Sequence, residues 1–129
     1  MTCDRIVIPL SKYGMEGEIV LAYPGYKQAQ LAEARGLAMT VKYVNGEEQI
    51  DLERGYFSGL EKASFFIESA PIPIRGYDSV LDLLDMADRK QRGAGDKLSE
   101  EILKAVKSIM DGDTSPFAES PEAVTERSD

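Results

Sequence analysis

Residues 98–110 have the sequence LSEEILKAVKSIM, and this pattern predicts the last helix of a mainly helical C-terminal half. Apolar side chains recur there every three or four positions, at Ile102, Val106, Ile109 and Met110. Such spacing is typical of an amphipathic helix with one buried face. Ser99 is the predicted N-cap, and Leu98 and Leu103 fit a hydrophobic staple around it. We therefore predict a helix over residues 99–111, ending at Gly112.

Three segments upstream also favour helices. Residues 27–38 consist almost entirely of good helix formers. Residues 51–68 begin at a credible N-cap, Asp51, and carry apolar side chains at helical spacing. Residues 79–91 begin at Ser79, a second predicted N-cap. The apolar stripe of that helix is predicted to consist of Val80, Leu83, Leu84 and Ala87.

Apolar and β-branched runs predict short antiparallel strands in the N-terminal part. Residues 5–10 and 18–23 are predicted to pair as a hairpin. Pro9 has no backbone N–H, so the first strand should end there or lie at an edge. Residues 39–44 alternate in polarity and predict a third strand.

Two punctuating segments complete the pattern. Asn45-Gly46 predicts a tight turn, because both residues tolerate positive φ, with a short return strand through Gln49-Ile50. Residues 70–74 contain two prolines and are predicted to be an extended connector, with pairing to another chain's sheet as the alternative. Residues 92–96 contain two glycines and predict a flexible break between the last two helices.

These elements predict an α+β fold with short antiparallel strands followed by, or interleaved with, four helices. Residues 1–112 are predicted to form a single domain. Residues 113–129 contain mostly Ser, Pro, Thr, Glu and Ala without periodicity, which predicts a disordered acidic tail. We expect the core to contain Ile6, Ile8, Ile19, Leu21, Leu31, Val41, Tyr43, Leu60, Ile67, Leu84, Ile102, Val106 and Ile109.

Charge is the strongest compositional signal. The chain of 129 residues has 23 acidic and 15 basic residues, a net charge of −8. Residues 111–129 hold six of the acids and one base, which leaves a net charge of −3 in residues 1–110. No basic stripe is present, so nucleic-acid binding through phosphates is not expected. An acidic surface instead suits a basic protein partner.

The residue inventory argues against several kinds of chemistry. The chain has no histidine, which removes the commonest general base and the usual catalytic triads. Its one cysteine, Cys3, cannot form an internal disulfide, and we interpret it as a free thiol near the N-terminus. No signal peptide and no membrane-spanning run are predicted, so we expect a cytoplasmic protein. We expect no enzymatic activity, no cofactor and no metal.

Three local patterns have a weak resemblance to ligand sites. Asp111, Asp113, Ser115 and Glu122 match positions of a calcium loop, but Pro116 stands where the loop needs glycine. Residues 93–97 precede a helix but lack the spacing of a phosphate-binding loop. We therefore interpret both as a helix end and a connector. Three aspartates at i, i+3 and i+6 are interpreted as a solvated helix face rather than a cation site, namely Asp82, Asp85 and Asp88.

Adjacent aromatic pairs predict a surface for a partner. Tyr56 and Phe57 form one pair, and Phe65 and Phe66 form another, within the helix predicted over residues 51–68. Neighbouring residues on a helix point in different directions, so one member of each pair should lie outside a single core stripe. An apolar face left over would serve a protein partner or an oligomer. These four residues are our predicted partner contacts.

The C-terminal part of the chain resembles tail assembly chaperones of long-tailed bacteriophages. Residues 97–106, KLSEEILKAV, resemble a helix of the L-x-E-E-I-x-x-A-I type, and Gly112-Asp113-Thr114-Ser115-Pro116 resembles the polar Ser-Pro tail that follows it in that family. The resemblance covers the C-terminal helix and tail only. It implies a non-enzymatic protein that coats the helical tape-measure protein and presents it to tail tube subunits. A homo-oligomer is a further expectation, which rests on the apolar face described above.

Two other classes of function stay open. The first is a small acidic inhibitor or decoy that binds a basic nucleic-acid-processing enzyme, with carboxylates in place of phosphates. The second is an enzyme subunit or small-ligand domain whose site is assembled from residues scattered along the chain. A decoy should lose its partner steeply as salt rises, whereas an apolar interface should not.

Overall fold

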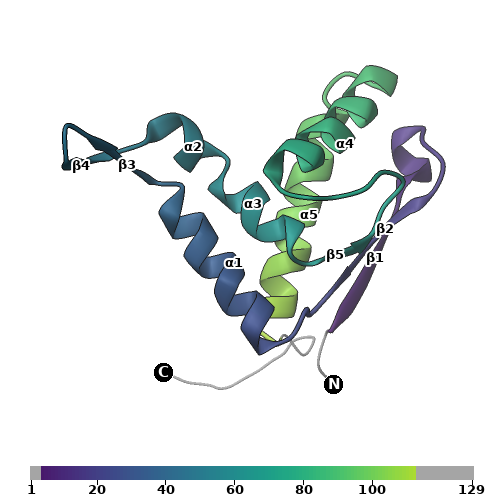
Figure 1. Ribbon diagram of the computed structural model, residues 1–129. Helices are drawn as coiled ribbons and strands as arrows, with labels where there is room; N and C mark the ends of the chain where they lie inside the picture. Colours follow the sequence, from purple (N-terminus) through teal and green to yellow (C-terminus); the bar gives the residue numbers. More distant parts are fainter. Residues whose placement is uncertain (1–3, 113–129) are drawn as a thin grey trace, which may run out of the picture.

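The computed structural model describes residues 4–112 and has an α+β fold, as predicted (Figure 1). The predicted tail, Cys3 and most of the calcium-like pattern lie outside the described residues. In chain order the elements are β1 (Arg5–Pro9), the 3-10 helix η1 (Leu10–Tyr13), β2 (Glu18–Ala22), α1 (Tyr26–Ala38), β3 (Val41–Val44), β4 (Glu47–Ile50), α2 (Leu52–Tyr56), α3 (Ser58–Ser64), β5 (Ile67–Ser69), α4 (Tyr77–Lys90) and α5 (Ala94–Met110).

A three-stranded antiparallel sheet in the order β1-β2-β5 forms one layer. The predicted hairpin of β1 and β2 is confirmed, with Ile8 opposite Ile19 and Pro9 at the end of the strand. Ile8, Ile19 and Leu21 are buried, and α5 packs against both strands. The sheet therefore has its apolar side chains under the longest helix.

The prediction of one helix over residues 51–68 is wrong in its extent. Asp51 is the N-cap as expected, and its Oδ1 accepts the Arg54 N–H at 3.0 Å. The helix then breaks at Phe57 into α2 and α3, and α3 ends at Ser64. Aromatic and β-branched residues follow it, and they favour strand where a sheet edge is free. Ile67–Ser69 accordingly pairs with β2 as β5.

The start of α5 also differs from the prediction. The helix begins at Ala94, five residues before Ser99, with Gly93 as N-cap at φ 94°. The predicted break is therefore confined to the few residues before Ala94. Leu98 is not part of a staple outside the helix but a fully buried residue within it. Similarly, Ser79 is not the N-cap of α4 but lies in its first turn, and the N-cap is Gly76. The apolar stripe predicted for α4 is buried throughout.

Two predicted core positions are exposed. Helix α1 packs on α3 through its small residues Ala29, Ala32 and Gly36, so Leu31 lies on the outer face. Small side chains are favoured where two helices pack closely. The choice of Leu31 as a core residue, because it is large and apolar, therefore predicted the wrong buried face of α1. Tyr43 lies on the β3–β4 hairpin, which projects from the body (Figure 1). The hairpin turn itself is confirmed, with Asn45 at φ 54° and followed by a positive-φ glycine.

A polar cluster fastens η1 to α5. Lys12 and Tyr13 both hydrogen-bond to the carboxylate of Glu101, with a Lys12 Nζ to Oε2 distance of 2.5 Å. Burial alone would raise the pKa of Glu101, but the hydrogen bonds from Lys12 and Tyr13, with the charges of Lys12 and Lys104, lower it overall. Burial and the same carboxylate raise the pKa of Tyr13 to about 12.

The lowered pKa of Glu101 predicts an acid-sensitive contribution to stability. That contribution is present above the unfolded-state pKa and is lost as pH falls through the folded-state pKa. We expect Glu101→Gln to reduce the free energy of unfolding at pH 7, with the difference from wild type shrinking below roughly pH 4.3, the ordinary pKa of Glu. Urea unfolding over a pH series measures this, with Glu100→Gln as the exposed neighbouring control. A difference that stays constant to pH 2.5 would contradict the assignment.

The buried position of Leu98 gives a direct test of where α5 begins. Leu98 is 0% exposed, whereas Leu103 on the same helix is 40% exposed. We expect Leu98→Ala to lower the free energy of unfolding by about 2–5 kcal/mol. Leu103→Ala should cost less, roughly 1–2 kcal/mol, because part of its side chain is already exposed to water. Denaturant unfolding of both variants measures the difference, and equal costs would contradict the helix register described here.

Candidate functional site

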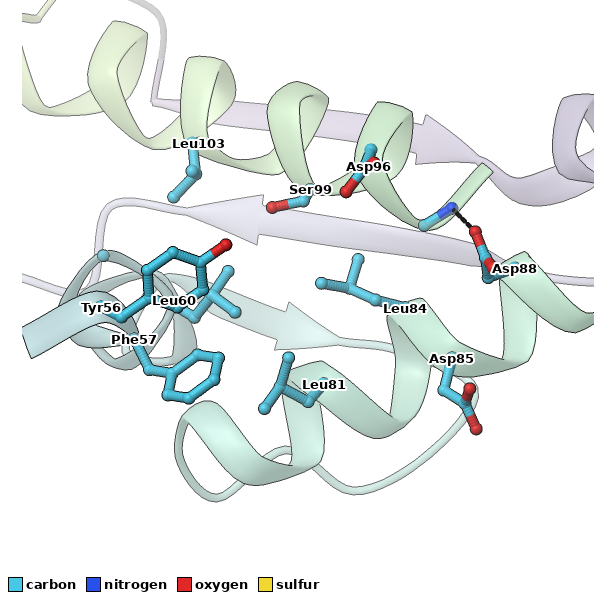
Figure 2. A pocket seen from close by; sticks show the side chains of 12 residues that line it. Tyr56, Phe57, Leu60, Leu81, Leu84, Asp85, Asp88, Asp96, Ser99 and Leu103 are labelled. Atoms are coloured by element: carbon cyan, nitrogen blue, oxygen red, sulfur yellow. Dashed lines mark hydrogen bonds between the residues drawn. The ribbon is translucent and has the colours of Figure 1, made fainter. Parts of the chain in front are cut away.

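A hollow of about 550 Å³ lies between the α2–α3 segment, α4 and α5. We call it the α4–α5 hollow. Figure 2 shows apolar side chains from the three elements facing one another across it, with Leu103 of α5 opposite Tyr56 and Leu60. Its lining consists of Tyr56, Phe57, Gly59, Leu60, Leu81, Leu84, Asp85, Asp88, Gly95, Asp96, Ser99 and Leu103.

Three aromatic rings make one wall of this hollow rigid. The Phe57 ring stacks on that of Tyr77, with centroids 5.2 Å apart and planes 9° apart. The Tyr56 ring meets Phe57 edge-on, with centroids 5.1 Å apart. Both arrangements are favoured by the aromatic quadrupole. Phe57 lies at the break between α2 and α3, so that break places its ring in the wall.

The four predicted partner contacts have different positions. Tyr56 is 83% exposed and stands at the mouth of the hollow, and Phe57 is half-buried in its wall. Phe65 is half-buried against the core. Phe66 is 1% exposed, so its assignment to a partner surface is wrong. The helix that would have turned it outward ends at Ser64, and its ring fills the core instead.

The charged side chains lining this hollow are all acidic, namely Asp85, Asp88 and Asp96. Asp88 has a structural role, because its Oδ1 accepts the N–H groups of Gly93 at 2.9 Å and Gly95 at 3.0 Å. It therefore caps the N-terminus of α5 from the neighbouring helix, which no local pattern could have shown. Asp85 forms an exposed pair with Arg89 at 2.9 Å.

A second hollow of about 320 Å³ lies further along α5, between that helix, α1 and α3. We call it the α1–α5 hollow. It shares Gly59 and Leu103 with the first hollow, so the two meet at this pair of residues. No sequence pattern indicated either hollow, because each is lined by residues from three separate elements. Its lining consists of Glu33, Gly59, Lys62, Leu103, Val106, Lys107, Met110 and Asp111.

A third depression has a structural explanation. Arg35 and Arg75 line it with the buried carboxylate of Glu61. Glu61 accepts the Tyr77 N–H at 2.9 Å and a hydrogen bond from Arg35 at 3.3 Å. It thus caps α4 and links that helix to α1, which satisfies a charge that would be costly if buried alone.

Comparisons with known proteins assign no family to the chain: no family model, no curated protein and no solved structure matches it. Between residues 4 and 112, no three or more Cys, Asp or Glu side chains are grouped so as to hold a metal ion. Over the same residues no helix has both the length and the apolar character needed to span a membrane. The arrangement of the α4–α5 hollow suits the binding of apolar side chains.

The cap that Asp88 provides is testable. We expect Asp88→Ala to lower the free energy of unfolding by about 0.5–2 kcal/mol, because two amide groups at the start of α5 lose their acceptor. Asp88→Asn should retain part of that stability, since its side-chain oxygen still accepts. Hydrogen exchange at the Gly95 amide and urea unfolding measure the effect. Asp82→Ala, an exposed change on the same helix, is the control, and an equal loss there would contradict the cap.

Proposed function

We propose that this protein is a non-enzymatic assembly chaperone that binds helical segments of a larger protein in the α4–α5 hollow. The observation that carries the proposal is an apolar concave surface with an exposed tyrosine, Tyr56, at its mouth. Aromatic anchors beside a pocket are typical of protein-binding hot spots. The resemblance of residues 97–116 to tail assembly chaperones supports a tape-measure or tail tube protein as the partner, encountered in the cytoplasm of the host cell.

Charge supports a separate protein partner over the chain's own C-terminus. Residues 113–129 contain five acids and one base. The charged residues that line the hollow are acidic too, so the tail would meet like charges there. A partner with apolar and basic side chains is favoured on both counts. The modest size of the hollow suits a contact that the tail tube later replaces.

The decoy alternative has less support. A decoy needs carboxylates presented in place of phosphates, whereas many acids of the described region already pair with bases inside the chain. Glu68 pairs with Arg5 at 2.7 Å, and Glu33 pairs with Lys62 at 2.5 Å. Glu61 and Asp88 act as helix caps. These roles leave the apolar hollow as the more distinctive surface.

Co-expression tests the proposal. We expect the gene to lie next to a very long reading frame for a helical protein, and that protein to stay soluble only when this chain is present. Tyr56→Ala should reduce the soluble fraction several-fold, because it removes an exposed anchor without opening the core. Tyr26→Ala, which is similarly exposed but does not line the hollow, is the matched control. No such neighbour, or a soluble fraction unaffected by this chain, would refute the proposal.

Salt separates the two candidate functions. The complex with the long helical protein should survive 1 M NaCl in sedimentation, because exposed charge pairs are screened and apolar contacts are not. Loss of the complex between about 0.1 and 0.5 M NaCl would instead favour the decoy. The same runs on the chain alone test whether it self-associates.

A further inference from the structure

The α4–α5 and α1–α5 hollows lie next to each other along α5 and share two lining residues. Both are lined by Gly59 and Leu103, and a Cβ built on Gly59 would lie 3.6 Å from Leu103 Cδ2. The Leu103 side chain therefore lies close against Gly59 at the point where the two hollows meet. We call the combined surface, from Gly95 to Asp111 of α5, the α5 groove.

The lining residues of α5 recur at helical spacing, and this sets the length of the groove. They lie beside the buried stripe, which shares Val106 with them, and they are Gly95, Asp96, Ser99, Leu103, Val106, Lys107 and Met110, followed by the C-cap residue Asp111. At 1.5 Å per residue this set of residues spans about 24 Å, which matches roughly four turns of a second helix laid beside it. A helix in an apolar groove is a common mode of peptide recognition.

The groove has different charge at its two ends. Asp85, Asp88 and Asp96 line the end at the start of α5. Asp85 pairs with Arg89 and Asp88 caps α5, so Asp96 is the lining acid with neither an ion pair nor a capping role among the described residues. At the other end the charges balance, because Lys62 pairs with Glu33 and Lys107 with Asp111. An occupant should therefore carry its positive charge at one end, beside Asp96.

Helix dipoles then fix the direction of the occupant. Basic residues stabilise a helix most at its C-terminal end, where the dipole is negative. The positive N-terminal end of α5 lies at the acidic end of the groove. A helix with a basic C-terminal end, running antiparallel to α5, satisfies both preferences.

We propose that the α5 groove binds one amphipathic helix of about four turns, with Lys and Arg at its C-terminal end, antiparallel to α5. The inference rests on the proposed function and specifies the partner segment. The occupant is a segment of another protein, because the chain's own residues 113–129 are acidic. A second copy does offer a helix with a basic C-terminal end, α4 with Arg89 and Lys90, but the apolar stripe of α4 is buried in its own fold.

Synthetic peptides of about 16 residues provide the test. One carries a Leu stripe, a single Trp and three Lys or Arg residues at its C-terminal end. A second has the same composition with the basic residues at its N-terminal end, and a third has Glu in their place. The protein contains no tryptophan, so the fluorescence of the peptide Trp reports binding to the full chain directly. We expect the first peptide to bind, the second about tenfold more weakly, and the third not measurably.

Two matched pairs of variants locate the site. Gly59→Gln should place a side chain where the two hollows meet and weaken binding of the first peptide at least tenfold. The Gly59→Ala variant should bind that peptide nearly as tightly as wild type, because a Cβ has room there. Asp96→Lys should reduce binding and reverse the preference between the first two peptides. Asp78→Lys is its control, because Asp78 also lies in the first turn of a long helix but does not line the groove.

The outcomes separate this inference from the proposed function. Equal binding of the first two peptides would overturn the orientation, and binding unaffected by Gly59→Gln would overturn an occupant that spans both hollows. Failure of every peptide to bind would overturn the inference as a whole. The co-expression test uses the natural partner and the Tyr56 variant, so it can still succeed when the peptides fail, which would place the partner on a different surface.

Discussion

Burial of one stripe of α5 is the constraint on which the rest of the structure depends. Leu98, Ile102 and Ile109 are among the least exposed side chains of the chain, and they pack between the sheet and α4. Removing such side chains from water stabilises the fold by roughly 1.5–3 kcal/mol each. The cap from Asp88 fixes where the helix starts, and the contact of Glu101 with Lys12 fixes the turn after β1 beside it.

The elements that pack on α5 leave part of its surface uncovered, and this uncovered surface is the α5 groove. Helices α3 and α4 cover the buried stripe, while the neighbouring stripe around Leu103 stays half open. Leu103 and Met110 add apolar surface to this stripe, and exposed apolar surface is a candidate site for association. On the proposed function, structure and binding would use adjacent faces of one element.

The sequence predicted correctly those elements whose boundaries depend on neighbouring residues. The Asn45-Gly46 turn, the Asp51 cap and the stripe of α4 depend on neighbouring residues, and they are where the sequence places them. The misplaced elements depend on distant partners. Ser99 is a good cap in isolation, but Asp88 from another helix caps α5 earlier, and the free edge of β2 takes Ile67–Ser69 from the predicted helix. The site was missed for the same reason, since three separate elements build it.

Two glycines within helices, Gly95 and Gly59, have different surroundings. A glycine within a helix costs about 1 kcal/mol relative to alanine. Gly95 has a structural reason, because a Cβ there would lie 3.1 Å from Asp88 Oδ1 and 3.2 Å from the Leu84 carbonyl oxygen. Gly59 has no such reason, since a Cβ would meet only Leu103, at ordinary contact distance. Gly59 lies where the two hollows meet, so a longer side chain at this position would project beside Leu103 and obstruct the helix that we propose as the occupant.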